Sequence, residues 1–85
     1  MARIDEFFHA HPERQAAHPT QVACGWCVVS ATSGPLLQLS TYGSEDRQIH
    51  GKVTQTLQLN ESNASDLIQI ILQVFPGVQV ARGSK

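Results

Sequence analysis

The sequence has few charged residues and no excess of basic ones. Charged side chains make up 15% of the 85 residues, and the net charge at pH 7 is −1, against a typical charged share of about 25%. A strongly basic nucleic-acid-binding domain has a pI above about 9, whereas this chain has a pI near 6.4. Long-range attraction to phosphate is therefore weak, and the low charge indicates that a partner covers part of the surface.

Long hydrophobic runs and cysteines are also scarce. No segment approaches the roughly 18 consecutive apolar residues of a membrane span. The N-terminus contains Asp5 and Glu6 and lacks the apolar run of a signal peptide. The two cysteines, Cys24 and Cys27, are interpreted as reduced, buried thiols of an unexported chain. These absences predict a cytoplasmic protein that does not cross a membrane.

The rest of the sequence predicts one α+β domain over residues 1–85. Its parts are an N-terminal helical segment (1–20), a short antiparallel sheet of three to four strands (21–59), an α-helix packed on one face of that sheet (60–76) and a tail (77–85). A domain of this size buries only about 60% of the surface that its unfolded chain exposes. Oligomerisation is therefore an expected source of further stability.

Three segments have the pattern of β-strands. Residues 22–31 are β-prone and apolar on both faces, which is typical of a central strand. Residues 36–42 and 53–59 alternate between apolar and polar side chains, and this period of two predicts strands with one apolar and one polar face.

Two segments have the pattern of helices. Ile4, Phe7 and Phe8 recur at helical spacing and predict a short N-terminal helix, which Pro12 ends. Asn60 is positioned to cap the C-terminal helix. That helix carries an apolar stripe formed by Ala64, Leu67, Ile68, Ile71 and Phe75. Its apolar surface is wider than a three-stranded sheet covers, so a second chain or the N-terminal phenylalanines must cover the rest.

The sequence contains no recognisable catalytic set. Catalysis by a nucleophile needs a base and a group that orients it, and no such set is present, so the chain is predicted not to be an enzyme and to need no cofactor. Cys24 and Cys27 have the spacing of a redox motif, but they lie in a strand, where residues three apart point to opposite faces. Zinc binding stays open as an alternative, since five side chains close in sequence are of the ligating type. They are His9, His11, His18, Cys24 and Cys27.

The hairpin formed by residues 36–42 and 53–59 is predicted to have a polar face. Alternation places Gln38, Ser40 and Tyr42 beside Thr54, Thr56 and Gln58, with Arg47, His50 and Lys52 at the loop end. An aromatic ring can stack on a base while basic side chains contact phosphates, although an ordinary solvated face has the same pattern. The candidate nucleic-acid-binding residues are Gln38, Ser40, Tyr42, Arg47, Lys52, Thr54 and Thr56.

The order of elements resembles a known family. Gly51 and Lys52 lead into a strand that ends at Leu59, and Asn60 and Glu61 begin a helix with spaced Leu and Ile. This arrangement is similar to the single-stranded-DNA-binding transcriptional coactivators called positive cofactor four, over roughly half the chain. The resemblance implies a homodimer through the C-terminal helices, a sheet face that holds single-stranded nucleic acid, and a phosphate contact at Lys52. Segments 39–44 and 52–56 also resemble small bacterial proteins of unassigned activity, which implies no function.

Two hypotheses follow from the sequence. The first is a small homodimeric module that binds single-stranded DNA or RNA. The alternative is a non-enzymatic subunit of a larger complex, which docks through apolar residues that include Phe7, Phe8 and Trp26. Low charge and many uncharged polar residues favour the alternative.

Overall fold

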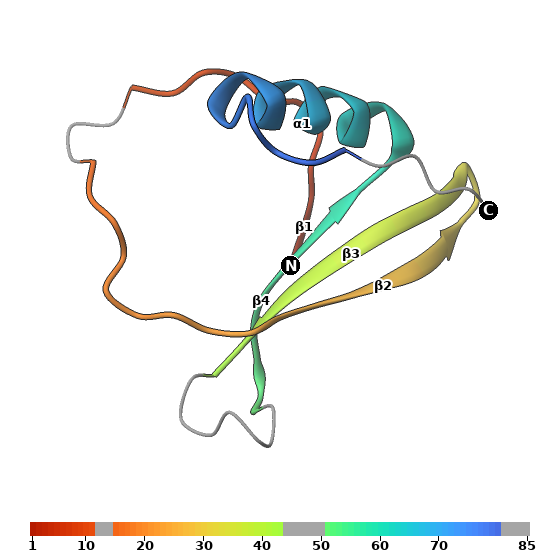
Figure 1. The fold of residues 1–85 in the computed structure, drawn as a ribbon. Helices are drawn as coiled ribbons and strands as arrows, with labels where there is room; N and C mark the ends of the chain where they lie inside the picture. The colour runs from red at the N-terminus through yellow and green to blue at the C-terminus, as the bar shows by residue number, and fades with distance from the viewer. Residues whose placement is uncertain (12–14, 44–50, 81–85) are drawn as a thin grey trace.

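A computed structural model of the chain describes residues 1–11, 15–43 and 51–80. In chain order the elements are β1 (Ala2–Arg3), β2 (Cys24–Ala31), β3 (Gly34–Tyr42), β4 (Val53–Leu59) and α1 (Glu61–Val74). The strands form one four-stranded sheet in the order β1-β4-β3-β2, and the helix follows β4 directly (Figure 1). The α+β class predicted from the sequence is confirmed.

β2 and β3 form a tight antiparallel hairpin. Their register pairs Trp26 with Leu39 and Ala31 with Gly34, so that Thr32 and Ser33 make the connection. Gly34 has φ of +131°, a conformation that side chains with a Cβ rarely adopt. The glycine therefore lets the chain reverse direction at this position.

β3 and β4 are also antiparallel, and their ladder contains a bulge. Ser40 pairs with Thr56 and Thr41 with Gln55, but the next residue of β3, Tyr42, pairs with Val53. Thr54 is therefore the extra residue of the bulged strand. The extra residue shifts by one position the alternation of side chains between the two faces of the sheet. Residues of β4 before the bulge therefore point to the side opposite to the one that simple alternation predicts.

The predicted N-terminal helix is wrong. Residues 4–11 contain no helix, and Ala2–Arg3 instead pairs in parallel with Leu57 and Gln58 of β4. The amide of Ile4 extends this contact by donating to the carbonyl of Gln58 at 2.9 Å. A helix this short is marginal in water, whereas the free side of β4 offers the backbone ready hydrogen-bond partners. The sheet is consequently mixed rather than purely antiparallel.

Two expectations for the first long strand are also wrong. β2 lies at the edge of the sheet and not at its centre. Cys24 and Cys27 are free and exposed rather than buried. The sequence predicts burial of β2 on both faces, whereas Trp26 and Val28 are exposed in the described part of the chain.

The start of α1 is fixed by hydrogen bonds. The side chain of Asn60 accepts from the amide of Asn63 at 2.8 Å, which satisfies one of the unpaired amides of the first turn. The side-chain amide of Asn63 donates to the carbonyl of Asp5 at 3.0 Å. Asn63 is the one buried residue of the helix, so this contact holds the N-terminal segment against the first turn.

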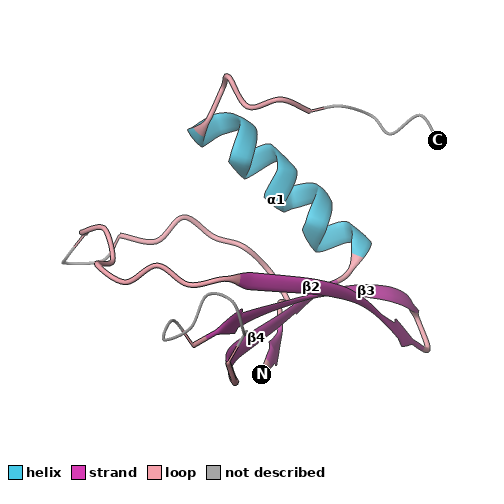
Figure 2. Ribbon diagram, turned by 60° about the horizontal axis from the view of Figure 1, so that its bottom comes forward, coloured by secondary structure: helices cyan, strands magenta, loops and turns pink. Residues whose placement is uncertain are grey.

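The apolar core is small and lies where β4 passes into α1. Among the described residues only Leu36 and Leu59 are buried apolar side chains, at 5% and 4% exposure. Figure 2 shows α1 leaving the sheet obliquely, and it contacts the sheet chiefly through β4. The helix therefore covers one end of the sheet face, and the rest of its apolar stripe is not packed on the strands.

We expect Asn60→Ala to lower the free energy of unfolding by about 1 kcal/mol, because the amide of Asn63 loses its acceptor. In a domain of this size such a loss lowers the melting temperature by about 4–8 °C. Thermal unfolding followed by circular dichroism measures the change, and Asn60→Asp, which keeps an acceptor, serves as the control. Equal melting temperatures for wild type and Asn60→Ala would contradict the cap.

Candidate functional site: the two faces of the sheet

One face of the sheet carries a set of uncharged polar side chains, termed here the polar face. The register places Ser40 opposite Thr56 and Gln38 opposite Gln58, and residues that pair directly point to the same side. Tyr42 follows Ser40 by two positions and lies on this side as well. The polar face consists of Gln38, Ser40, Tyr42, Thr56 and Gln58.

The polar face is bonded largely to itself. The hydroxyls of Ser40 and Thr56 lie 3.3 Å apart, and both residues are buried. The side-chain amide of Gln58 donates to the side-chain oxygen of Gln38 at 2.9 Å. Paired hydroxyls and amides have less capacity left for a ligand. Ser40 and Thr56 therefore act as a cross-strand link, while the half-buried Gln38 and Gln58 keep some access to solvent.

Tyr42 lies across β2. A Cβ atom at Gly25 would stand 3.1 Å from Cε1 of the Tyr42 ring and 3.5 Å from its hydroxyl. The ring edge thus occupies the space that a side chain on Gly25 would fill, and Tyr42 is half-buried. Glycine at position 25 is what allows the ring to approach the neighbouring strand this closely.

Two predicted site residues that the structure describes, Thr54 and Lys52, are not part of the polar face. Thr54 is on the opposite side of the sheet, where its hydroxyl lies 2.7 Å from that of Thr41. The sequence placed Thr54 on the polar face because simple alternation assumes an unbroken ladder, whereas β4 contains a bulge at this residue. Lys52 is exposed just before β4, where its carbonyl accepts from the amide of Gly43 at 3.1 Å. Arg47 and His50 lie outside the described residues.

Arg3 joins the polar face and was missed by the sequence reasoning. It pairs with Gln58 in the parallel ladder of β1 and β4, so it points to the same side as Gln58. Its side chain is exposed. The sequence could not indicate strand β1, because two residues are too few to show a period of two. The spacing of Ile4, Phe7 and Phe8 favoured a helix in this segment instead.

The other side of the sheet, termed here the apolar face, consists of Trp26, Val28, Leu37, Leu39, Leu57 and Leu59. These residues pair across the three long strands, as Trp26 with Leu39 and Leu39 with Leu57 show. Trp26 is 72% exposed, Val28 66% and Leu57 44%. A monomeric protein rarely leaves adjacent large apolar side chains in water. The apolar face is therefore a candidate binding surface.

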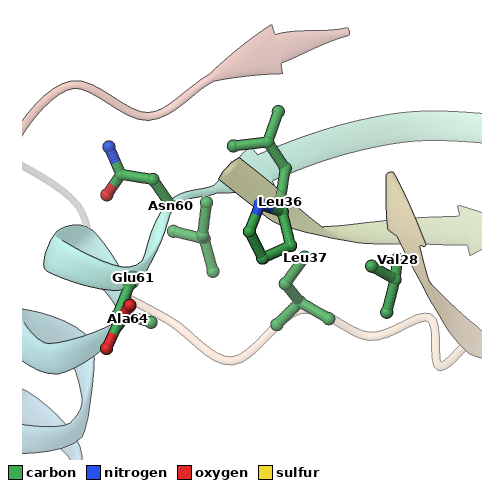
Figure 3. Close-up of a pocket in the computed structure, with 8 residues that line it drawn as sticks. Val28, Leu36, Leu37, Asn60, Glu61 and Ala64 are labelled. Atoms are coloured by element: carbon green, nitrogen blue, oxygen red, sulfur yellow. The ribbon is translucent and has the colours of Figure 1, made fainter. Parts of the chain in front are cut away.

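The apolar face opens into a pocket beside the first turn of α1. The pocket has a volume of about 310 Å³, and Figure 3 shows Val28 and Leu37 from the sheet opposite Ala64 from the helix. A second hollow, of about 590 Å³, separates Phe7 and Phe8 from Ile70 and Val74 of α1. Phe8 and Val74 are exposed, so the N-terminal phenylalanines leave part of the apolar surface of the helix uncovered.

The described residues do not form a zinc site. No group of three or more His, Cys, Asp or Glu side chains among them is placed to hold a metal ion. Cys24 and Cys27 pair with Thr41 and Gln38 respectively, so they point to opposite faces as the sequence predicted. The rings of His9 and His11 are 4.4 Å apart in an edge contact.

We expect Thr56→Val to lower the free energy of unfolding by about 1–3 kcal/mol, because the buried hydroxyl of Ser40 loses its partner. Adding Ser40→Ala should restore part of this loss, since no buried hydroxyl then remains unpaired. Urea unfolding of both single variants and the double variant gives the coupling energy. Strictly additive effects would show that the two hydroxyls do not support each other.

A scan against family models, a search of curated proteins and a search of solved structures each find no match to this chain. No helix among the described residues is long and apolar enough to cross a membrane.

Proposed function

We propose that the chain is a cytoplasmic, non-enzymatic protein-interaction subunit whose apolar face binds another polypeptide. The observation that carries the proposal is the exposure of Trp26 and Val28 side by side on a face that is otherwise leucine. Thirteen large apolar side chains are exposed in the described part of the chain, against two that are buried. Packing such a face against a second protein supplies the burial that one chain of this size lacks.

The composition of the apolar face suits a protein partner. Binding interfaces are enriched in aromatic residues and depleted of charge at their centre, and a tryptophan is the side chain that most often dominates their energy. Trp26 is the only tryptophan of the chain, and the six residues of the apolar face include no charged side chain. We therefore assign Trp26 the central position in the interface.

The helix α1 carries further exposed apolar residues. Ile68, Ile70 and Val74 are exposed along it, and Phe75 follows at its end. The sequence left open whether a second chain or the N-terminal phenylalanines cover this stripe, and the family resemblance implied a homodimer through the C-terminal helices. We include the stripe in the docking surface, since its apolar width exceeds what β4 covers.

Cross-linking from each face of the sheet tests this function. A photoreactive phenylalanine derivative is placed at position 26 on the apolar face, and in a matched variant at position 38 on the polar face, in cells that normally make the protein. We expect position 26 to form a covalent adduct with a polypeptide in much higher yield than position 38. Adducts from position 38 alone, or adducts with nucleic acid, would overturn the assignment.

A second candidate function is the binding of single-stranded nucleic acid on the polar face. One specific observation favours it: Arg3 is carried by β1 to the side of the sheet that holds Gln58, Gln38 and Tyr42. An arginine, an aromatic ring and amide groups on one face can contact phosphate, stack on a base and bond its edge. The low overall charge makes this function secondary.

We expect Arg3→Ala, if this second function operates, to reduce the slope of log affinity against log salt by about 0.7, the contribution of one phosphate contact with a single strand. Fluorescence anisotropy with labelled single-stranded DNA and RNA across a salt series measures it, with Gln69→Ala on α1 as the control. Absence of saturable binding at low salt would remove this candidate.

A further inference from the structure

The two edges of the sheet differ in how they are protected. On one side the two-residue strand β1 covers part of β4, and short edge strands of this kind discourage further pairing. On the other side β2 runs for eight residues with no strand beyond it in the described chain. Proteins usually guard such an edge with charge, proline or a bulge, and β2 pairs with β3 in an unbroken register without charged residues or proline.

Alternate residues of β2 direct their backbone groups toward the open edge of the sheet. The amide of Tyr42 donates to the carbonyl of Ala23 at 3.1 Å, so Ala23 and every second residue after it direct their backbone groups toward β3. The alternate residues direct theirs toward the open edge. They are Cys24, Trp26, Val28 and Ser30.

We propose that β2 pairs antiparallel with β2 of a second copy of this chain, about a two-fold axis at Cys27, and joins the two sheets into one. This inference deepens the proposed function and rests on it, because it names the first polypeptide that the subunit binds. The composition of β2, apolar on both faces as in a central strand, fits a strand that gains a neighbour on its open side.

The strand is complementary to itself. With the axis at Cys27, Trp26 stands opposite Val28 of the second copy, and their outward backbone groups form a hydrogen-bonded pair. Cross-strand pairs of an aromatic and a β-branched residue are favourable. Residues 15–43 contain no Asp, Glu, Lys or Arg, so two copies approach without charge repulsion. Paired in this way, the two apolar faces become continuous.

The register makes a distinctive prediction about the cysteines. Cys27 would lie opposite Cys27 of the second copy in a non-hydrogen-bonded pair, with Cα atoms about 4.5 Å apart, within the range of about 4.4–6.8 Å that a disulfide requires. Cys24 would lie about 20 Å from Cys24 of the second copy, since six residues of strand separate them. Only Cys27 can therefore bridge the two copies in this register.

Oxidation with diamide tests the register. Diamide takes up the two electrons and two protons that two Cys27 thiols release when they form the disulfide. We expect wild type and Cys24→Ser to form a covalent dimer at micromolar concentration, and Cys27→Ser to form none. A covalent dimer that persists in Cys27→Ser, or none in wild type, would overturn the register.

Sedimentation of the reduced chain tests the edge itself. Val28→Pro removes an amide that points to the open edge, whereas Val29→Pro removes one that points toward β3. We expect Val28→Pro to raise the dimer dissociation constant at least tenfold while circular dichroism stays native, and Val29→Pro to disrupt the fold. Val28→Lys, which adds charge to the edge, should also raise the constant at least tenfold if the proline variant does not fold.

The results separate the two proposals. Loss of the Cys27 dimer, with cross-linking from position 26 to a different polypeptide retained, overturns the pairing of β2 and leaves the docking function in place. A wild-type chain that sediments as a monomer up to hundreds of micromolar also overturns the pairing. Failure of both experiments overturns the proposed function as well.

Discussion

Replacing the exposed pair of the apolar face, as Trp26→Thr with Val28→Thr, is expected to weaken binding of the polypeptide cross-linked from position 26 at least thirtyfold. Both side chains are exposed to water in the single chain. Their apolar area therefore contributes to binding when a partner buries it. Loss of an interface residue of this kind costs about 2 kcal/mol or more, which corresponds to about thirtyfold in affinity.

The same double variant should leave the isolated chain nearly as stable as before. Substitution of exposed residues usually changes the free energy of unfolding by about 0.5 kcal/mol or less, and threonine keeps the preference for a strand. Titration calorimetry with the partner and urea unfolding of the dilute chain measure the two quantities. Gln38→Ala on the polar face is the control for binding. A large loss of stability with unchanged affinity would mean that Trp26 packs inside the subunit.

A second large effect is expected from Leu59→Ala, which should lower the free energy of unfolding by about 2–5 kcal/mol. Leu59 is one of two buried apolar side chains in the described chain, and domains of this kind have only about 5–15 kcal/mol in total. The variant should therefore be partly or fully unfolded at 37 °C.

Leu57→Ala provides a matched control, because Leu57 lies two positions earlier on the same face of β4 but is 44% exposed. We expect its effect on the stability of the dilute chain to be less than half that of Leu59→Ala. Urea unfolding by circular dichroism gives both values. Equal losses for the two variants would show that the apolar face is packed along its whole length.

The sequence predicted the parts of the fold that depend on local pattern. Alternation in residues 36–42 and 53–59 matches β3 and β4, and Asn60 caps the helix through the amide of Asn63 as expected. These features were predicted correctly because each depends on residues that are close in sequence. An alternation of apolar and polar residues indicates a strand, and a capping side chain indicates the start of a helix.

The parts that failed depend on contacts distant in sequence. The pairing of Ala2–Arg3 with β4 joins segments more than fifty residues apart, and no local pattern encodes it. The bulge at Thr54 follows from the pairing of two strands, so it reverses a face that alternation alone assigns to the polar side. Arg3 was missed and Thr54 misplaced in the candidate site for these reasons.

The position of β2 is informative because the sequence predicts a central strand and the single chain has β2 at the edge of the sheet. An apolar strand without charge is typical of the middle of a sheet, yet β2 lies at an edge with Trp26 exposed. Pairing with a second copy and cover by a partner would reconcile the two. The pattern in the sequence then describes the assembled protein rather than the isolated subunit.

Acrylamide quenching of the single tryptophan, Trp26, tests the central claim most directly. It is measured in the complex isolated from cells, after subtraction of the emission of a matched complex that carries Trp26→Phe, and again in the chain separated from its partners at high dilution. We expect strong quenching in the separated chain, where the indole is exposed to water, and several-fold weaker quenching in the complex, where a polypeptide covers the apolar face. Equally strong quenching in both would show that the face stays open in the working protein, and would contradict the account.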